Sequence, residues 1–165
     1  MPAGAEGCWA VAPMSVDGDA TPLARRYLAA RFDEPSLVPD VVAEFGEHLA
    51  DTDLRRFEDV ELVVAVPSRT TVASAFAALV AERLGRPLVL PAPLTWVRDV
   101  PPLKAVPPAE RAALIADALS AGPLSGSVLL VDDVVRTTAT FAEATRAVLA
   151  GGAARVMCLA MVRVD

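Results

Sequence analysis

The sequence predicts a single α/β domain, an open and mainly parallel twisted sheet with helices on both faces. Segments with helical spacing of apolar residues alternate along the chain with short runs of β-branched and aliphatic residues. Several of these runs are almost continuously apolar, which is typical of parallel strands covered on both faces. The length of 165 residues suits one domain. We expect residues 1–57 to form an N-terminal segment with helices, and residues 58–165 to form the core sheet.

Two amphipathic helices and a strand are predicted in the first part of the chain. The first helix covers residues 21–32, because Thr21 and Pro22 are typical of an N-cap and a first helical residue. The second covers residues 38–49, where valine, phenylalanine and leucine recur at helical spacing. The β-branched run at 61–66 is then expected to be a strand.

The middle of the chain is predicted to continue this alternation around an irregular segment. A helix is expected at 72–84, because a glycine and a proline follow it closely. A strand is expected at 87–90. Residues 91–108 are rich in proline and cannot form one regular element, so we expect a loop or flap with a short strand at 94–98. Residues 109–119 have a helical pattern.

The last part of the chain contains the strongest predicted strand, SVLLVDD at residues 127–133. A helix at 141–149 follows, closed by two glycines, and ARVMCLAMV forms the last strand. Asp132 and Asp133 are expected where the buried strand emerges. Open parallel sheets bind ligands beyond the carboxyl ends of their strands, so this end is a candidate site.

The acid pair raises a question that folding alone does not answer, because two neighbouring carboxylates repel each other and are costly to bury without a partner. The residues that follow supply hydroxyl groups, backbone N–H groups and a helix N-terminus, which together suit a phosphate. They are Arg136, Thr137, Thr138, Ala139 and Thr140. Carboxylates can accept hydrogen bonds from a sugar diol or help to hold Mg²⁺ through water. A phosphorylated sugar would satisfy both halves of this unit.

A structural explanation of the same residues stays open. Asp133 is also explained as a strand end and Thr140 as a helix cap, and each is common by itself. The combination of an acid pair and a threonine-rich loop in one strand–loop–helix unit favours a binding site.

Composition and charge argue against several other function classes. The net charge of −6 is unfavourable for broad binding to nucleic acid. Cys8, Cys158 and the single His48 cannot form a standard zinc site. No apolar run is long enough to span a membrane, and the first residues lack the pattern of a secretion signal, so we expect a cytoplasmic protein.

Residues 128–140, VLLVDDVVRTTAT, resemble the ribose-5-phosphate signature of type I phosphoribosyltransferases, which is four apolar residues, two acids, two apolar residues and Thr-Thr-Gly-x-Thr. VVAVPSR resembles the strand and pyrophosphate loop of that family, and WVRDVPPLKAVPPAER resembles its flap. With the leading segments LARRYLAARF and VVAEFGEHLA, the resemblance covers most of the chain. It is closest to the ComF-like branch, which includes competence-associated proteins and domains attached to RecQ-like helicases.

The resemblance implies an enzyme that binds phosphoribosyl pyrophosphate with Mg²⁺ and transfers the phosphoribosyl group to a nitrogenous acceptor, releasing pyrophosphate. It implies that Asp132 and Asp133 hold the ribose hydroxyls and help to hold Mg²⁺. It also implies a 5-phosphate site at residues 136–140. The pyrophosphate would be met by Ser68, Arg69, Arg98 and Lys104. The sequence does not name the acceptor, and a homodimer is compatible with it.

Three departures from the family pattern keep an alternative open. Thr138 stands where glycine is usual, Leu103 where glutamine is usual, and Leu114 where asparagine is frequent. A glycine lets the backbone approach a phosphate closely, and a Cβ atom weakens that approach. The alternative is a ribose-phosphate-binding module without turnover. An accessory role in DNA uptake or repair is a further alternative, based on the branch resemblance alone.

Overall fold

The computed structural model describes residues 4–14, 21–51, 54–101 and 106–164. Its main sheet has the strand order β1-β6-β5-β2, with every neighbouring pair parallel, and β3 and β4 form a small antiparallel ribbon. The α/β class and the parallel sheet with helices on both faces are therefore confirmed. The strands are β1 Cys8–Met14, β2 Leu62–Ala65, β3 Leu94–Trp96, β4 Leu119–Ala121, β5 Ser127–Val135 and β6 Arg155–Val164. The helices are α1 Pro22–Phe32, η1 Pro35–Leu37, α2 Val38–Asp51, η2 Leu54–Phe57, α3 Val72–Leu84, α4 Pro108–Ile115 and α5 Ala139–Ala150.

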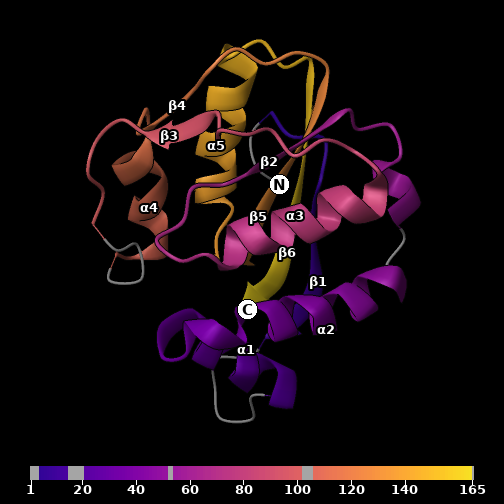
Figure 1. Ribbon diagram of the computed structural model, residues 1–165. Coiled ribbons are helices and arrows are strands. Elements are labelled where there is room, and N and C mark those ends of the chain that lie inside the picture. The colour runs from indigo at the N-terminus through magenta and orange to yellow at the C-terminus, as the bar shows by residue number, and fades with distance from the viewer. Residues whose placement is uncertain (1–3, 15–20, 52–53, 102–105, 165) are drawn as a thin grey trace.

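Two core layers cover the two faces of the main sheet. In the first core layer, α1, α2 and α3 pack through Tyr27, Phe45 and Phe76 against Leu129 of β5. In the second core layer, α5 and the β3-β4 ribbon pack against the other face, with Phe141 as the largest side chain. Figure 1 shows α1, α2 and α3 on one side of the strands and α5 with the β3-β4 ribbon on the other. Every helix in the described part of the chain is too short or too polar to cross a membrane.

The start of α1 and the end of α3 lie at the residues from which the sequence predicted them, Thr21 and Gly85. The hydroxyl oxygen of Thr21 accepts a hydrogen bond from the amide of Ala24 at 3.2 Å, and Pro22 occupies the first helical position of α1. At the other end of α3, Gly85 has a φ of 62°, a left-handed conformation that glycine adopts without strain. Local sequence signals therefore determine where these helices begin and end.

Two strand predictions need correction. The predicted strand at 87–90 is reduced to an isolated parallel bridge between Val63 and Leu88. Prolines at 87 and 91 lack the amide donors that a longer ladder requires. Conversely, β1 was not predicted, and it pairs with β6 as the edge strand of the sheet. The main sheet is thus not confined to residues 58–165.

The predicted helix at 109–119 is also too long. Helix α4 ends at Ile115, because Ala116 has an extended ψ of 130°. Leu119 then begins β4, which pairs with β3. The strand expected at 94–98 is present as the shorter Leu94–Trp96. Tertiary pairing between β3 and β4 thus replaces the last turn of the predicted helix.

Candidate functional site

The strongest candidate site lies at the carboxyl ends of the neighbouring strands β2 and β5. Strands β2 and β5 are parallel neighbours, with Ala65 paired to Val131. The helix after β2 packs in the first core layer, whereas the helix after β5 packs in the second. When the helices that follow two adjacent parallel strands lie on opposite faces, the loops at the carboxyl ends diverge and leave a crevice. Both chemically distinctive segments predicted from the sequence meet at this edge.

The loop after β2 contains the predicted Ser68 and Arg69, whose side chains are exposed. The amide of Val66 still donates to the carbonyl of Val131 at 2.8 Å, which keeps the start of this loop beside β5. The Ser68 hydroxyl accepts a hydrogen bond from the amide of Thr70 at 3.3 Å. Arg69 donates to the carbonyl of Val100 at 3.1 Å, so this loop also contacts the proline-rich segment.

Strand β5 continues past the point where the sequence predicted its end. Asp132 pairs with Ala160 and Val135 pairs with Arg163, so the acid pair lies within the ladder to β6. On its other side, β5 has already passed the last paired residue of β2, Ala65. The acid pair is therefore flanked by a strand on one side and by the Ser68 loop on the other. The pairing with β6 extends β5 to Val135. The apolar pattern does not report this pairing, so the strand end predicted from it came too early.

Asp133 is held by a side chain that the sequence analysis missed. Its carboxylate is only 1% exposed and forms an ion pair with the guanidinium of Arg31 in α1. The same guanidinium donates to the Tyr27 hydroxyl at 2.6 Å. Burial alone would lower the pKa of Arg31, but the charge of Asp133 and the contact with Tyr27 outweigh it and raise that pKa. Burial first, and the Asp133 charge second, raise the pKa of Tyr27.

One signal in the sequence could have identified Arg31. It follows Tyr27 by four residues, and positions four apart lie on the same face of a helix. A charged residue on the buried face of an amphipathic helix requires a partner. The sequence does not show which acid that partner is.

Asp132 is also buried, with 7% of its surface exposed, and its Oδ1 atom accepts a hydrogen bond from the amide of Asp133 at 2.8 Å. Burial and the neighbouring Asp133 charge raise its pKa well above the usual range. The amide hydrogen bond and Arg31 offset this only in part. Burial raises the pKa of Cys158 to about 12, and the charge of Asp132 contributes to this shift. The acid pair is therefore asymmetric, because Asp133 forms the ion pair with Arg31, whereas burial and the neighbouring charge raise the pKa of Asp132.

The hydroxyl loop follows the acid pair directly, as predicted. Thr138 is the N-cap residue of α5, but its side chain makes no capping hydrogen bond. The first amides of a helix have no acceptor within the helix, and the helix dipole places partial positive charge there. Thr137 and Thr140 are partly accessible, Ala139 is buried, and Arg136 is exposed. This loop can donate hydrogen bonds to an anion.

Arg98, one of the two cations predicted in the flap, contacts the end of α4. The guanidinium of Arg98 donates to the carbonyls of Leu114 at 2.7 Å and Ala116 at 2.9 Å, and so caps the end of α4. Lys104, and the Leu103 departure, lie outside the described residues. Trp96 donates from its indole nitrogen to the carbonyl of Pro67 at 3.1 Å and remains partly exposed.

The predicted Mg²⁺ would need oxygen ligands from the acid pair and its surroundings. Among the residues that the structure describes, no group of three or more His, Cys, Asp and Glu side chains could hold a metal ion. Because the carboxylate of Asp133 already forms an ion pair with Arg31, the two carboxylates of the acid pair do not fit direct binding of a metal ion by both. Mg²⁺ keeps several waters and often binds through substrate phosphates, so these residues fit it only as a companion of a phosphorylated ligand.

Comparison of the sequence with protein-family models gives no match, and comparison with curated proteins gives none. The chemistry of the site is therefore argued from its own residues. It combines a buried acid pair, a hydroxyl loop at the start of α5, and a second loop that presents Ser68 and Arg69. Such a set can accept hydrogen bonds from hydroxyl groups and donate them to anionic groups at the same sheet edge.

Proposed function

We propose that this chain is a phosphoribosyltransferase-like protein that binds phosphoribosyl pyrophosphate at the edge between β2 and β5. The observation that carries the proposal is the position of the acid pair at this edge, with the hydroxyl loop and the N-terminus of α5 directly after it. Ligands of open parallel sheets bind at such switch points. A ribose with a phosphate at one end matches the two kinds of group that meet there.

Under this proposal each part of the ligand has a partner. The acid pair accepts hydrogen bonds from the ribose hydroxyls, and the amides of the hydroxyl loop with Thr137 and Thr140 donate to the 5-phosphate. Ser68 and Arg69 meet the pyrophosphate. In the reaction, the bond between C1 of the ribose and the pyrophosphate oxygen breaks, and a bond from C1 to the acceptor nitrogen forms. Such a step depends on positioning and on stabilisation of charge, which these residues can supply.

The test is a pyrophosphate-release assay with phosphoribosyl pyrophosphate, Mg²⁺ and a panel of nitrogenous bases. The wild type is expected to release pyrophosphate with at least one base, and the double variant Asp132→Asn/Asp133→Asn is expected to lose both release and binding. Calorimetric titration of phosphoribosyl pyrophosphate measures the binding separately. Equal binding by the double variant and the wild type would contradict the assignment of the site.

A second candidate function is a ribose-phosphate-binding module without turnover. Two observations favour it: Arg98 is engaged by the carbonyls of α4, and Thr138 carries a Cβ atom at the start of the phosphate loop. This candidate predicts that ribose 5-phosphate raises the melting temperature, because it binds the folded state, while no pyrophosphate is released. Measurable turnover would eliminate it.

A further inference from the structure

The acid pair is almost inaccessible to solvent, which bears on how a ligand reaches it. Asp133 is 1% exposed and Asp132 is 7% exposed. A sugar hydroxyl must come within about 3 Å of a carboxylate oxygen to form a hydrogen bond. In the observed arrangement, the guanidinium of Arg31 occupies the Oδ2 atom of Asp133. Something must therefore move before a ligand can use both carboxylates.

The element that covers Asp133 is α1, through the ion pair of Arg31. The side chain of Arg31 is 20% exposed, whereas that of Asp133 is 1% exposed, so the solvent-accessible part of this ion pair belongs to Arg31. Its second contact, with the Tyr27 hydroxyl, comes from the preceding turn of the same helix. Tyr27 is buried and packs edge-to-face against Phe45 of α2. Arg31 and Tyr27 thus link α1 to the site in β5.

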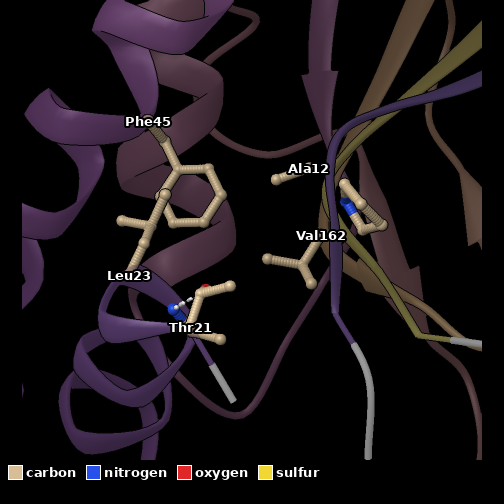
Figure 2. A pocket seen from close by; sticks show the side chains of 7 residues that line it. Ala12, Thr21, Leu23, Phe45 and Val162 are labelled. Atoms are coloured by element: carbon tan, nitrogen blue, oxygen red, sulfur yellow. Dashed lines mark hydrogen bonds between the residues drawn. The ribbon is translucent and has the colours of Figure 1, made fainter. Parts of the chain in front are cut away.

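The residues at the two ends of α1, Thr21 and Phe32, are both accessible to solvent. Its first turn borders a small cavity of about 10 Å³, which Thr21 and Leu23 line together with Phe45, Ala12 and Val162. Figure 2 shows these side chains around the gap between α1 and the strand ends. At the other end of α1, Phe32 is 60% exposed. Arg26 of α1 forms an ion pair with Glu44 of α2 at 2.6 Å, and because both side chains are accessible to solvent, this pair contributes little to holding the helix.

We propose that α1 is a latch over the acid pair, and that a ligand that takes the carboxylate of Asp133 must first break its contact with Arg31. This inference rests on the proposed function, since it concerns access to the same site. Opening the latch costs free energy, so the apparent affinity is the intrinsic affinity reduced by the fraction of open molecules. Arg31 is thereby a regulator of ligand affinity and not a ligand contact.

The test compares Arg31→Met with Arg26→Met, which removes an arginine from the same helix without touching Asp133. Calorimetry with ribose 5-phosphate is expected to give about tenfold or tighter binding for Arg31→Met, because the latch is removed. Arg26→Met is expected to bind like the wild type. In the wild type, saturation with ribose 5-phosphate is expected to speed hydrogen exchange of the α1 amides, because the helix loses its link to β5.

The outcomes separate the latch from the proposed function. If the wild type binds ribose 5-phosphate but Arg31→Met binds no more tightly, the latch is wrong and the proposed function stands. If no variant binds ribose 5-phosphate or phosphoribosyl pyrophosphate, the proposed function fails and the latch fails with it. Should Arg31→Met not fold, the wild-type exchange measurement decides alone, and unchanged α1 exchange at saturation overturns the latch.

Discussion

Asparagine substitutions at the two adjacent aspartates are expected to change stability in opposite directions. Asp132→Asn keeps an oxygen that accepts the amide hydrogen bond of residue 133, and it removes a buried charge. Asp133→Asn removes the negative charge that pairs with Arg31, so the partly buried positive charge of Arg31 is left without that partner. The two changes have the same chemistry, so each serves as a control for the other.

The magnitudes follow from the charges at the site. At an effective dielectric of about 20, two like charges about 4 Å apart repel by about 4 kcal/mol, and the repulsion weakens as the separation grows. Arg31 offsets part of this repulsion, so we expect Asp132→Asn to raise the free energy of unfolding by about 1–2 kcal/mol at neutral pH. Breaking a buried ion pair costs about 3–5 kcal/mol, and the partial exposure of Arg31 favours the lower end for Asp133→Asn. In melting temperature, these values correspond to a gain of about 2–8 °C for Asp132→Asn and a loss of about 6–12 °C for Asp133→Asn.

The pH dependence of Asp132→Asn has a defined sign. The pKa of folded Asp132 lies above its unfolded value of 3.8, so the folded state binds the additional proton. Wild-type stability therefore falls as the pH rises from the unfolded pKa through the raised folded pKa. The advantage of Asp132→Asn is expected to grow across that window.

Urea unfolding followed by circular dichroism at pH 5 and pH 8 measures both effects. Asp59→Asn, at an exposed position, is the control and is expected to change stability by less than about 0.5 kcal/mol. Stability changes of the same sign at 132 and 133 would refute the asymmetric acid pair. So would an advantage of Asp132→Asn that shrinks at higher pH.

Two further predictions concern α5. Glu143 accepts hydrogen bonds from the amide of Leu119 at 2.9 Å and from Arg146 at 2.8 Å, so Glu143→Gln is expected to cost about 1.5–3 kcal/mol in urea unfolding at pH 7. Burial raises the pKa of Glu143, but Arg146 and the backbone amides lower it overall. The cost of Glu143→Gln should therefore begin to shrink as the pH falls below the unfolded pKa of 4.5 and be lost once the pH passes through the lower, folded pKa; a cost that persists below that point would contradict it. Thr138→Gly is expected to tighten ribose 5-phosphate binding several-fold by calorimetry, because the loop amides can then approach the phosphate more closely. It should change stability by only a few tenths of a kcal/mol, since Thr138 makes no side-chain cap, and unchanged affinity would count against the phosphate loop.

The sequence by itself determined the features whose signals are local. Helix α1 begins at Thr21 because of its cap, and α3 ends at Gly85 because that residue adopts a left-handed conformation. The continuous apolar runs identified β5 and β6 as buried parallel strands. The acid pair and the hydroxyl loop are adjacent in the chain, so their proximity follows from the sequence without knowledge of the fold.

The tertiary structure alone decided the features that depend on partners distant in the chain. Strand β1 becomes part of the sheet through β6, and β5 extends beyond Asp132 for the same reason. Arg31 meets Asp133 although 102 residues separate them. Hydrophobic periodicity reports which face of an element is buried, but it does not report which charged group lies opposite. The asymmetry of the acid pair is therefore a property of packing between α1 and the sheet.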